Sequence, residues 1–132
     1  MDAPINDDAA AARADLDFWK ELAGGDDDSA RELLTLFLGD TSAQISLMVS
    51  GLAAGNADEV CRAAHTCVGS SSTCGLDSLA EVFRRVEQEA GDSSLDALSH
   101  SVPLVVETFD RVRARLTKVI ASSTSATIQE RP

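Results

Sequence analysis

The longest regular pattern in this 132-residue chain is LDALSHSVPLVVETFDRVRARLTKV, residues 95–119. Apolar residues recur in it at spacings of three and four, which is the period of one face of an α-helix. These residues are Leu95, Leu98, Val102, Val105, Phe109, Val112, Leu116 and Val119. Pro103 interrupts the pattern, so the sequence predicts either one kinked helix or a helix that begins afresh with Ser101 as its cap and Pro103 in its first turn.

Upstream of this segment, apolar stripes with the same spacing predict four more helices. They cover approximately residues 8–23, 29–55, 57–73 and 76–90. Gly24 and Gly25 end the first helix, and the run DDDS at 26–29 places capping side chains and carboxylates at the start of the second. Asn56 caps the third helix. The third helix ends in a Gly- and Ser-rich run whose local propensity favours a loop, but its apolar spacing continues, so we expect helix to about Thr73.

Together these segments predict a single all-α domain. Helices with long apolar faces and short connections pack as an antiparallel four-helix bundle, to which the first segment adds an N-terminal helix. We expect the bundle to span residues 8–120, with a flexible N-terminus at 1–7 and a disordered tail at 121–132, where no periodic apolar face is present.

The charge of the chain narrows the classes of partner. It carries 22 acidic and 11 basic residues, a formal net charge of −11, which is the wrong sign for binding nucleic acid or an anionic membrane surface. The first 60 residues hold 13 acidic and three basic residues, whereas the remaining 72 hold nine and eight. A surface that handles an anionic group is therefore expected in the second half.

The sequence also bears on the compartment. No stretch approaches the roughly 20 apolar residues of a membrane span, and the acidic start MDAPINDDAA lacks the basic and then apolar regions of a signal peptide. We therefore expect a cytoplasmic protein. Its three cysteines are then expected to be reduced thiols that pack as small apolar side chains.

His65 is the first candidate for chemistry. The apolar stripe of the third helix comprises Val60, Ala64, Cys67, Ser71 and Cys74. His65 lies about 140° around the helix from the middle of that stripe and should face outward. Gly69 follows one turn later, and because a glycine within a helix costs about 1 kcal/mol relative to alanine, its presence suggests that another molecule approaches the backbone there.

At these residues the sequence resembles a known family. AHTCVGSSSTCG at 64–75, followed by Leu76, Leu79, Phe83 and Glu87, is similar to the phosphorylation segment of histidine phosphotransfer (HPt) domains, whose pattern is approximately AHxLKGxSxxxG and then a helix. ELLTLFLGDTSAQ at 32–44 resembles the second helix of the family. The resemblance covers about residues 12–120 in the same order of elements. It implies a helical bundle with the reactive histidine exposed in the middle of a helix.

The resemblance also implies a function. His65 would accept a phosphoryl group from an aspartyl phosphate on a receiver domain, through Nε2 of a neutral imidazole, and pass it to another receiver. The partners would be receiver domains of response regulators or of a hybrid histidine kinase, which supply Mg²⁺, and the chain needs no cofactor of its own. It would be a phosphocarrier rather than a self-sufficient kinase or phosphatase.

One position departs from the family pattern. The family usually has a lysine three residues after the histidine, where this chain has Val68. Arg62, or Arg84 or Arg85 on the next helix, could supply the missing cation. Further candidates to face the receiver or to hydrogen-bond the phosphoryl group are Gly69, Ser72 and Gln88.

Two other readings are compatible with the sequence. Because Val68 replaces the usual lysine, the chain could be an HPt-like docking or regulatory module that binds a kinase or receiver without carrying phosphate. Alternatively, Cys61 and His65, spaced by four, could contribute to a metal-binding helical bundle, although Cys67 and Cys74 belong to the buried stripe and no Glu-x-x-His motif is present. His100 is expected in a loop or at a helix start.

Overall fold

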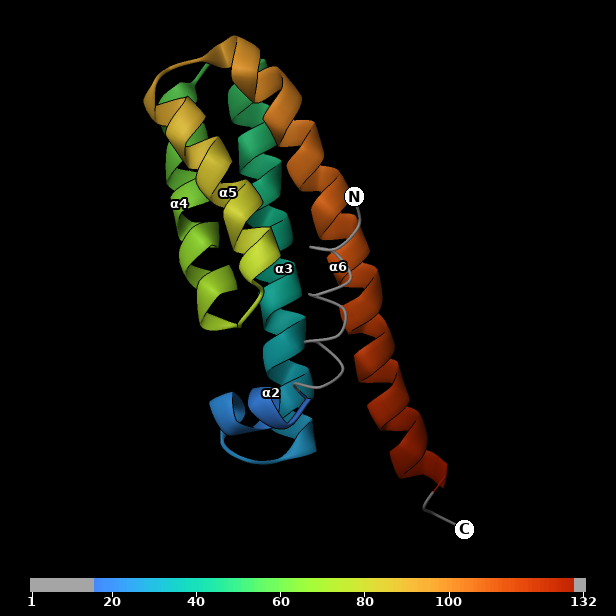
Figure 1. The fold of residues 1–132 in the computed structure, drawn as a ribbon. Helices are drawn as coiled ribbons and strands as arrows, with labels where there is room; N and C mark the ends of the chain where they lie inside the picture. The colour runs from blue at the N-terminus through green and yellow to red at the C-terminus, as the bar shows by residue number, and fades with distance from the viewer. Residues whose placement is uncertain (1–15, 130–132) are drawn as a thin grey trace.

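The computed structural model describes residues 16–129, and within that range it contains five α-helices and no strand (Figure 1). They are α2 (Leu16–Ala23), α3 (Asp27–Ala53), α4 (Ala57–Thr73), α5 (Asp77–Gly91) and α6 (Leu95–Gln129). The predicted all-α fold, a four-helix bundle with an additional N-terminal helix, is confirmed. Residues 8–15, where the first helix was predicted to begin, lie outside the described residues.

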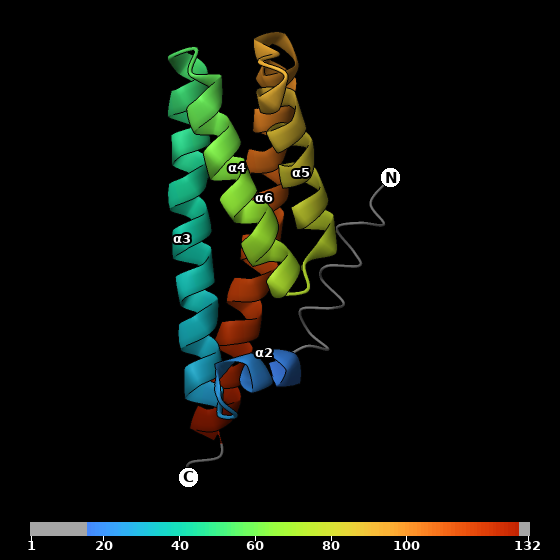
Figure 2. The ribbon, with the colours of Figure 1, turned by 90° about the vertical axis from the view of Figure 1, so that its left-hand side faces the viewer.

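The four long helices occupy the corners of the bundle. α4 packs against α3 and α5, and α6 also packs against α3 and α5, so α4 and α6 lie diagonally opposite (Figures 1 and 2). α3 and α6 are longer than the α4–α5 hairpin and extend beyond its turn, and α2 lies across α3 at that end (Figure 2). Trp19 of α2 is buried there, with its ring centroid 6.0 Å from that of Phe37. The short α2 thus closes one end of the core.

The predicted caps begin the helices. Asp26 accepts a hydrogen bond from the backbone N–H of Ser29 at 2.7 Å, and Asn56 accepts one from Glu59 at 3.1 Å, so each satisfies an amide that the helix leaves unpaired. The Asp26 carboxylate also accepts a hydrogen bond from the hydroxyl of Ser29 at 3.0 Å, and the two hydrogen bonds from Ser29 lower the pKa of Asp26. Gly55, in the α3–α4 loop, has a φ of 70°, in the left-handed region that glycine adopts without strain.

The last helix settles the alternative that the sequence left open at Pro103 and extends beyond its predicted end. α6 runs without interruption through Pro103, and Ser101 is buried within it, so the alternative in which Ser101 caps a new helix is wrong. Buried side chains on both sides of the proline, Leu98, Val102 and Val105, keep the segment in the core and offset the lost hydrogen bond. The helix also continues to Gln129, beyond the predicted end of the bundle at residue 120.

α3 is a long helix with a high mean hydropathy. By length and composition it is the one described helix that could cross a membrane, yet its inner face, which includes Leu34, Phe37 and Met48, belongs to the core of the bundle. Outside the core face, Leu36 and Leu47 remain 57% and 41% exposed on one side of the helix, and Val49 remains 47% exposed. The apolar character of α3 therefore has two parts, a core face and an exposed strip.

Candidate functional site

The side chains of α4 separate into a buried and an exposed face. All five residues of the predicted stripe are buried, from Val60 to Cys74. The His65 side chain is 76% exposed, in agreement with its position around the helix. Helical periodicity alone therefore locates the histidine on the surface of the bundle, where a partner protein can reach it.

A carboxylate from the neighbouring helix holds the imidazole. Oε2 of Glu87 on α5 lies 2.7 Å from Nδ1 of His65, and the Glu87 side chain is 28% exposed. A carboxylate only accepts hydrogen bonds, so Nδ1 carries the proton of this pair. Nε2 of the neutral ring then keeps its lone pair, which makes it the nucleophilic atom of an exposed imidazole.

Glu87 is a candidate site residue that the sequence did not single out. It appeared only as part of the family resemblance, with no role attached to it. A signal was present: Glu87 follows Phe83 by four residues and so lies beside the apolar stripe of α5, on the edge that faces a neighbouring helix. Which neighbouring side chain it meets depends on how α4 and α5 pack, and the pattern within one helix does not contain that information.

Gly69 lies on the same outward face as His65, one turn later. It is exposed, and a Cβ atom added to it would meet nothing within 4 Å. Gly51 on α3 is different, because a Cβ there would lie 3.0 Å from Val60 Cγ2 and 3.3 Å from the Asn56 carbonyl oxygen. Packing within the chain therefore accounts for Gly51 but not for Gly69.

The remaining predicted site residues fall into distinct positions. Ser72 and Gln88 are exposed, on α4 and α5 respectively. Val68 is half-buried and packs against the core, so its side chain fills space between helices. His100 is exposed within α6 rather than in a loop or at the helix start.

The three candidate arginines differ in their surroundings. Arg84 donates to Glu81 at 2.8 Å, and Arg85 donates to Glu89 at 3.2 Å, both within α5. Arg85 also lies about 160° around α5 from Glu87, so it faces away from the histidine. Arg62 is exposed and lies one turn before His65 on α4.

The cysteines do not assemble a metal site. Within residues 16–129, no group of three or more His, Cys, Asp or Glu side chains could hold a metal ion. Cys61 is half-buried between α4 and α5, and its thiol donates to the Glu87 backbone carbonyl at 3.7 Å. Burial raises the pKa of Cys67 to about 12 and that of Cys74 to about 11, so both remain protonated at neutral pH.

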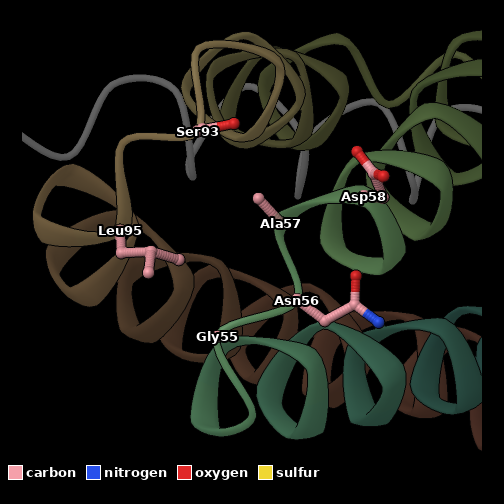
Figure 3. Close-up of a pocket in the computed structure, with 6 residues that line it drawn as sticks. All are labelled: Gly55, Asn56, Ala57, Asp58, Ser93 and Leu95. Carbon is pink, nitrogen blue, oxygen red and sulfur yellow. The ribbon is translucent and has the colours of Figure 1, made fainter.

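A pocket of about 250 Å³ lies at one end of the bundle, between the α3–α4 and α5–α6 loops (Figure 3). It is lined by Gly55, Asn56, Ala57, Asp58, Ser93 and Leu95. Its one charged side chain is a carboxylate, and it contains none of the predicted site residues. The functional candidate is therefore the exposed surface around His65 and not a cavity.

Comparison with known proteins identifies the family of the chain. A family model described as Hpt domain matches residues 32–121, which contain His65, Glu87 and most of the four-helix bundle. No match was found among curated proteins or among solved structures.

Proposed function

This chain belongs to the Hpt domain family, whose members take part in phosphotransfer in two-component signalling, and on that premise we propose that it is a phosphorelay intermediate. His65 accepts a phosphoryl group from an aspartate of one receiver domain and passes it to an aspartate of another. The observation that carries the proposal is the exposed imidazole whose Nδ1 is held by Glu87, because this arrangement leaves Nε2 free to react.

The transfer requires few groups from this chain. The Nε2 lone pair attacks phosphorus, the N–P bond forms, and the bond from phosphorus to the receiver aspartate oxygen breaks, which returns that aspartate as a carboxylate. The imidazole gains positive charge as the bond forms, and the Nδ1 proton stays between the ring and Glu87. Glu87 thus acts as a positioning residue that sets the tautomer and stabilises the charged ring. The reverse sequence phosphorylates the second receiver.

The receiver supplies what this chain lacks. Transfer of a phosphoryl group depends on in-line positioning and charge neutralisation, which Mg²⁺ on the receiver provides. Gly69 gives the receiver room beside His65, and Ser72 and Gln88 are exposed polar groups that can meet the phosphoryl oxygens or the partner. The chain is in this account a phosphocarrier in the cytoplasm, where receivers and kinase domains are found.

The exposed strip on α3 extends the proposed receiver surface. Gly51 marks the side of α3 that contacts α4, and Leu36 and Leu47 lie within about 60° of it around the helix. Both leucines are therefore on the exposed edge of α3 that faces α4. Exposed apolar side chains beside a reactive group are typical of a protein-binding surface.

A second candidate function is supported by one observation. Val68 is apolar and half-buried where the family pattern has lysine, which would suit a module that docks a receiver without carrying phosphate. Both functions use the same surface, so they differ only in whether His65 becomes phosphorylated.

The deciding experiment incubates the chain with a phosphorylated receiver and follows the label. We expect an acid-labile, base-stable label on the wild-type protein and none on His65→Gln, whose exposed substitution leaves the core intact. Binding of the receiver without any label on the wild type would support the docking module instead. Glu87→Gln keeps the shape of the acceptor but removes its charge, so we expect it to bind the receiver normally and to accept phosphate more slowly.

A further inference from the structure

A phosphoryl group on His65 would enter an unfavourable electrostatic environment. The group is an anion, the chain already has a net charge of −11, and the Glu87 carboxylate lies against the same ring. Like charges in such proximity destabilise the charged product unless a cation compensates. The receiver and its Mg²⁺ leave after transfer, so any fixed compensating charge in the free phosphorylated protein must come from this chain.

Ion pairs already occupy the nearby arginines of α5. Arg84 is bound to Glu81, and Arg85 is bound to Glu89 and faces away from His65. Arg62 has no such partner among the residues that the structure describes. Asp58 and Glu59 precede it by four and three residues, yet neither forms an ion pair with its guanidinium. Arg62 is therefore available to an incoming anion without first losing a partner.

The position of Arg62 on the helix brings it to the histidine. Residues three apart on an α-helix are neighbours on its surface, and side chains on a helix lean toward its N-terminus. The ring of His65 leans toward the turn that carries Arg62, and although Arg62 leans the same way, its long exposed side chain can turn back to reach a group on the ring. On the other side of the ring, three residues later, the half-buried Val68 offers no charge. Within α4, therefore, the cation one turn from the imidazole is on the N-terminal side.

We propose that Arg62 is the phosphoryl-binding cation of this chain, with its guanidinium hydrogen-bonded to oxygens of the phosphoryl group on His65 Nε2. The planar guanidinium matches two phosphoryl oxygens at once, which a single ammonium group does not. This inference rests on the proposed function and identifies the side chain that prolongs the life of the phosphorylated state after the receiver has left.

The test compares the lifetime of phosphorylated His65 in four proteins after the receiver is removed. Arg62→Ala is expected to shorten the half-life about fivefold, which is the effect of about 1 kcal/mol for an exposed charge pair. Arg62→Lys should retain part of the lifetime, since it keeps the charge but loses the bidentate geometry. Arg84→Ala is the matched control, another arginine beside the site, and should leave the half-life unchanged. Each variant should melt close to the wild-type temperature, because Arg62 is exposed and the ion pair of the half-exposed Arg84 with Glu81 lies on the surface.

A salt titration provides a second readout. Screening weakens an exposed charge pair, so the wild-type half-life should fall as ionic strength rises. The half-life of Arg62→Ala should not fall, because only the repulsion from Glu87 and the other acidic groups is left to be screened. An unchanged half-life in Arg62→Ala, or a loss in Arg84→Ala alone, would overturn the assignment of Arg62 while leaving the phosphorelay proposal intact. Absence of label on the wild-type protein would instead refute the proposed function itself.

Discussion

Alanine substitutions at three helical glycines separate folding from partner binding. Gly39 and Gly69 have nothing within 4 Å of an added Cβ, so Gly39→Ala and Gly69→Ala should each stabilise the fold by about 0.5–1 kcal/mol through helix propensity. For a domain of this size the melting temperature should rise by about 2–4 °C. At Gly51 the new methyl group meets the buried Val60, and overpacking of a core costs about 1–3 kcal/mol. Gly51→Ala should therefore melt at a lower temperature than Gly39→Ala and Gly69→Ala.

The same series predicts a functional loss at only one of the stabilised positions. If Gly69 is small because a receiver approaches the backbone beside His65, a methyl group there should reduce the rate of phosphotransfer about fivefold, which corresponds to about 1 kcal/mol. Melting curves and initial transfer rates at subsaturating receiver concentration measure the two effects. A Gly69→Ala protein that is stabilised and transfers at the wild-type rate would refute the reasoning that links Gly69 to the receiver. A larger side chain, in Gly69→Leu, should reduce transfer further while the fold persists.

Three more predictions concern the ring, the thiols and the α3 cap. Glu87→Ala should lower the rate of phosphorylation of His65 by about tenfold or more. It should also shift the nitrogen-15 resonances of the His65 ring toward those of a mixture of tautomers, and unchanged resonances would contradict the role of the carboxylate. A thiol reagent at pH 8 should modify the half-buried Cys61 first and the buried Cys67 only when the protein unfolds. The free energy of unfolding should fall as pH rises from about 9 toward 12, since the Cys67 thiol loses its proton at a lower pH in the unfolded chain than in the folded one. Asp26→Ala should lower the melting temperature at pH 7, because the variant loses the cap of α3. Folding lowers the pKa of Asp26 from its ordinary value of 3.8, so the stabilisation by the charged cap is lost as pH falls from about 3.8 through the lower pKa of the folded state, and the two proteins should then melt alike. An equal difference at pH 2 would exclude the charged cap as its cause.

The fold was largely predictable because helical periodicity records burial along one element at a time. The stripe of α4 and the exposure of His65 both follow from a rotation of about 100° per residue. At the Gly- and Ser-rich end of α4, local propensity favours a loop whereas the apolar spacing predicts a helix, and the segment is helical to Thr73. Pro103 was ambiguous because a proline's tolerance depends on the packing of its neighbours, and these hold α6 in one piece.

The candidate site could be predicted from the sequence only where its residues lie on the same helix. His65, Gly69 and Arg62 lie on the outer face of α4, and their order along the chain places them together. The hydrogen bond from His65 to Glu87 joins two helices, and its geometry depends on the packing of α4 against α5. The choice among the three arginines likewise required the ion pairs of Arg84 and Arg85, because sequence spacing alone permits several partners for each.

The apolar composition of α3 does not by itself show which of its residues are buried in the core and which are exposed. A mean hydropathy that is compatible with a membrane span arises here from two faces with different environments, one in the bundle core and one exposed beside α4. Replacement of Leu36 or Leu47 by aspartate would distinguish a receiver-binding strip from a merely tolerated surface, since these exposed positions contribute little to the core.

The proposed mechanism requires that one particular atom of His65, Nε2, is phosphorylated. Long-range proton–nitrogen correlation spectra of the phosphorylated, nitrogen-15-labelled protein distinguish the two ring nitrogens, and coupling to phosphorus identifies the one that carries the phosphoryl group. The hydrogen bond between Nδ1 and Glu87 predicts phosphorus on Nε2, with the proton retained on Nδ1. Phosphorus on Nδ1, or on any residue other than His65, would contradict it.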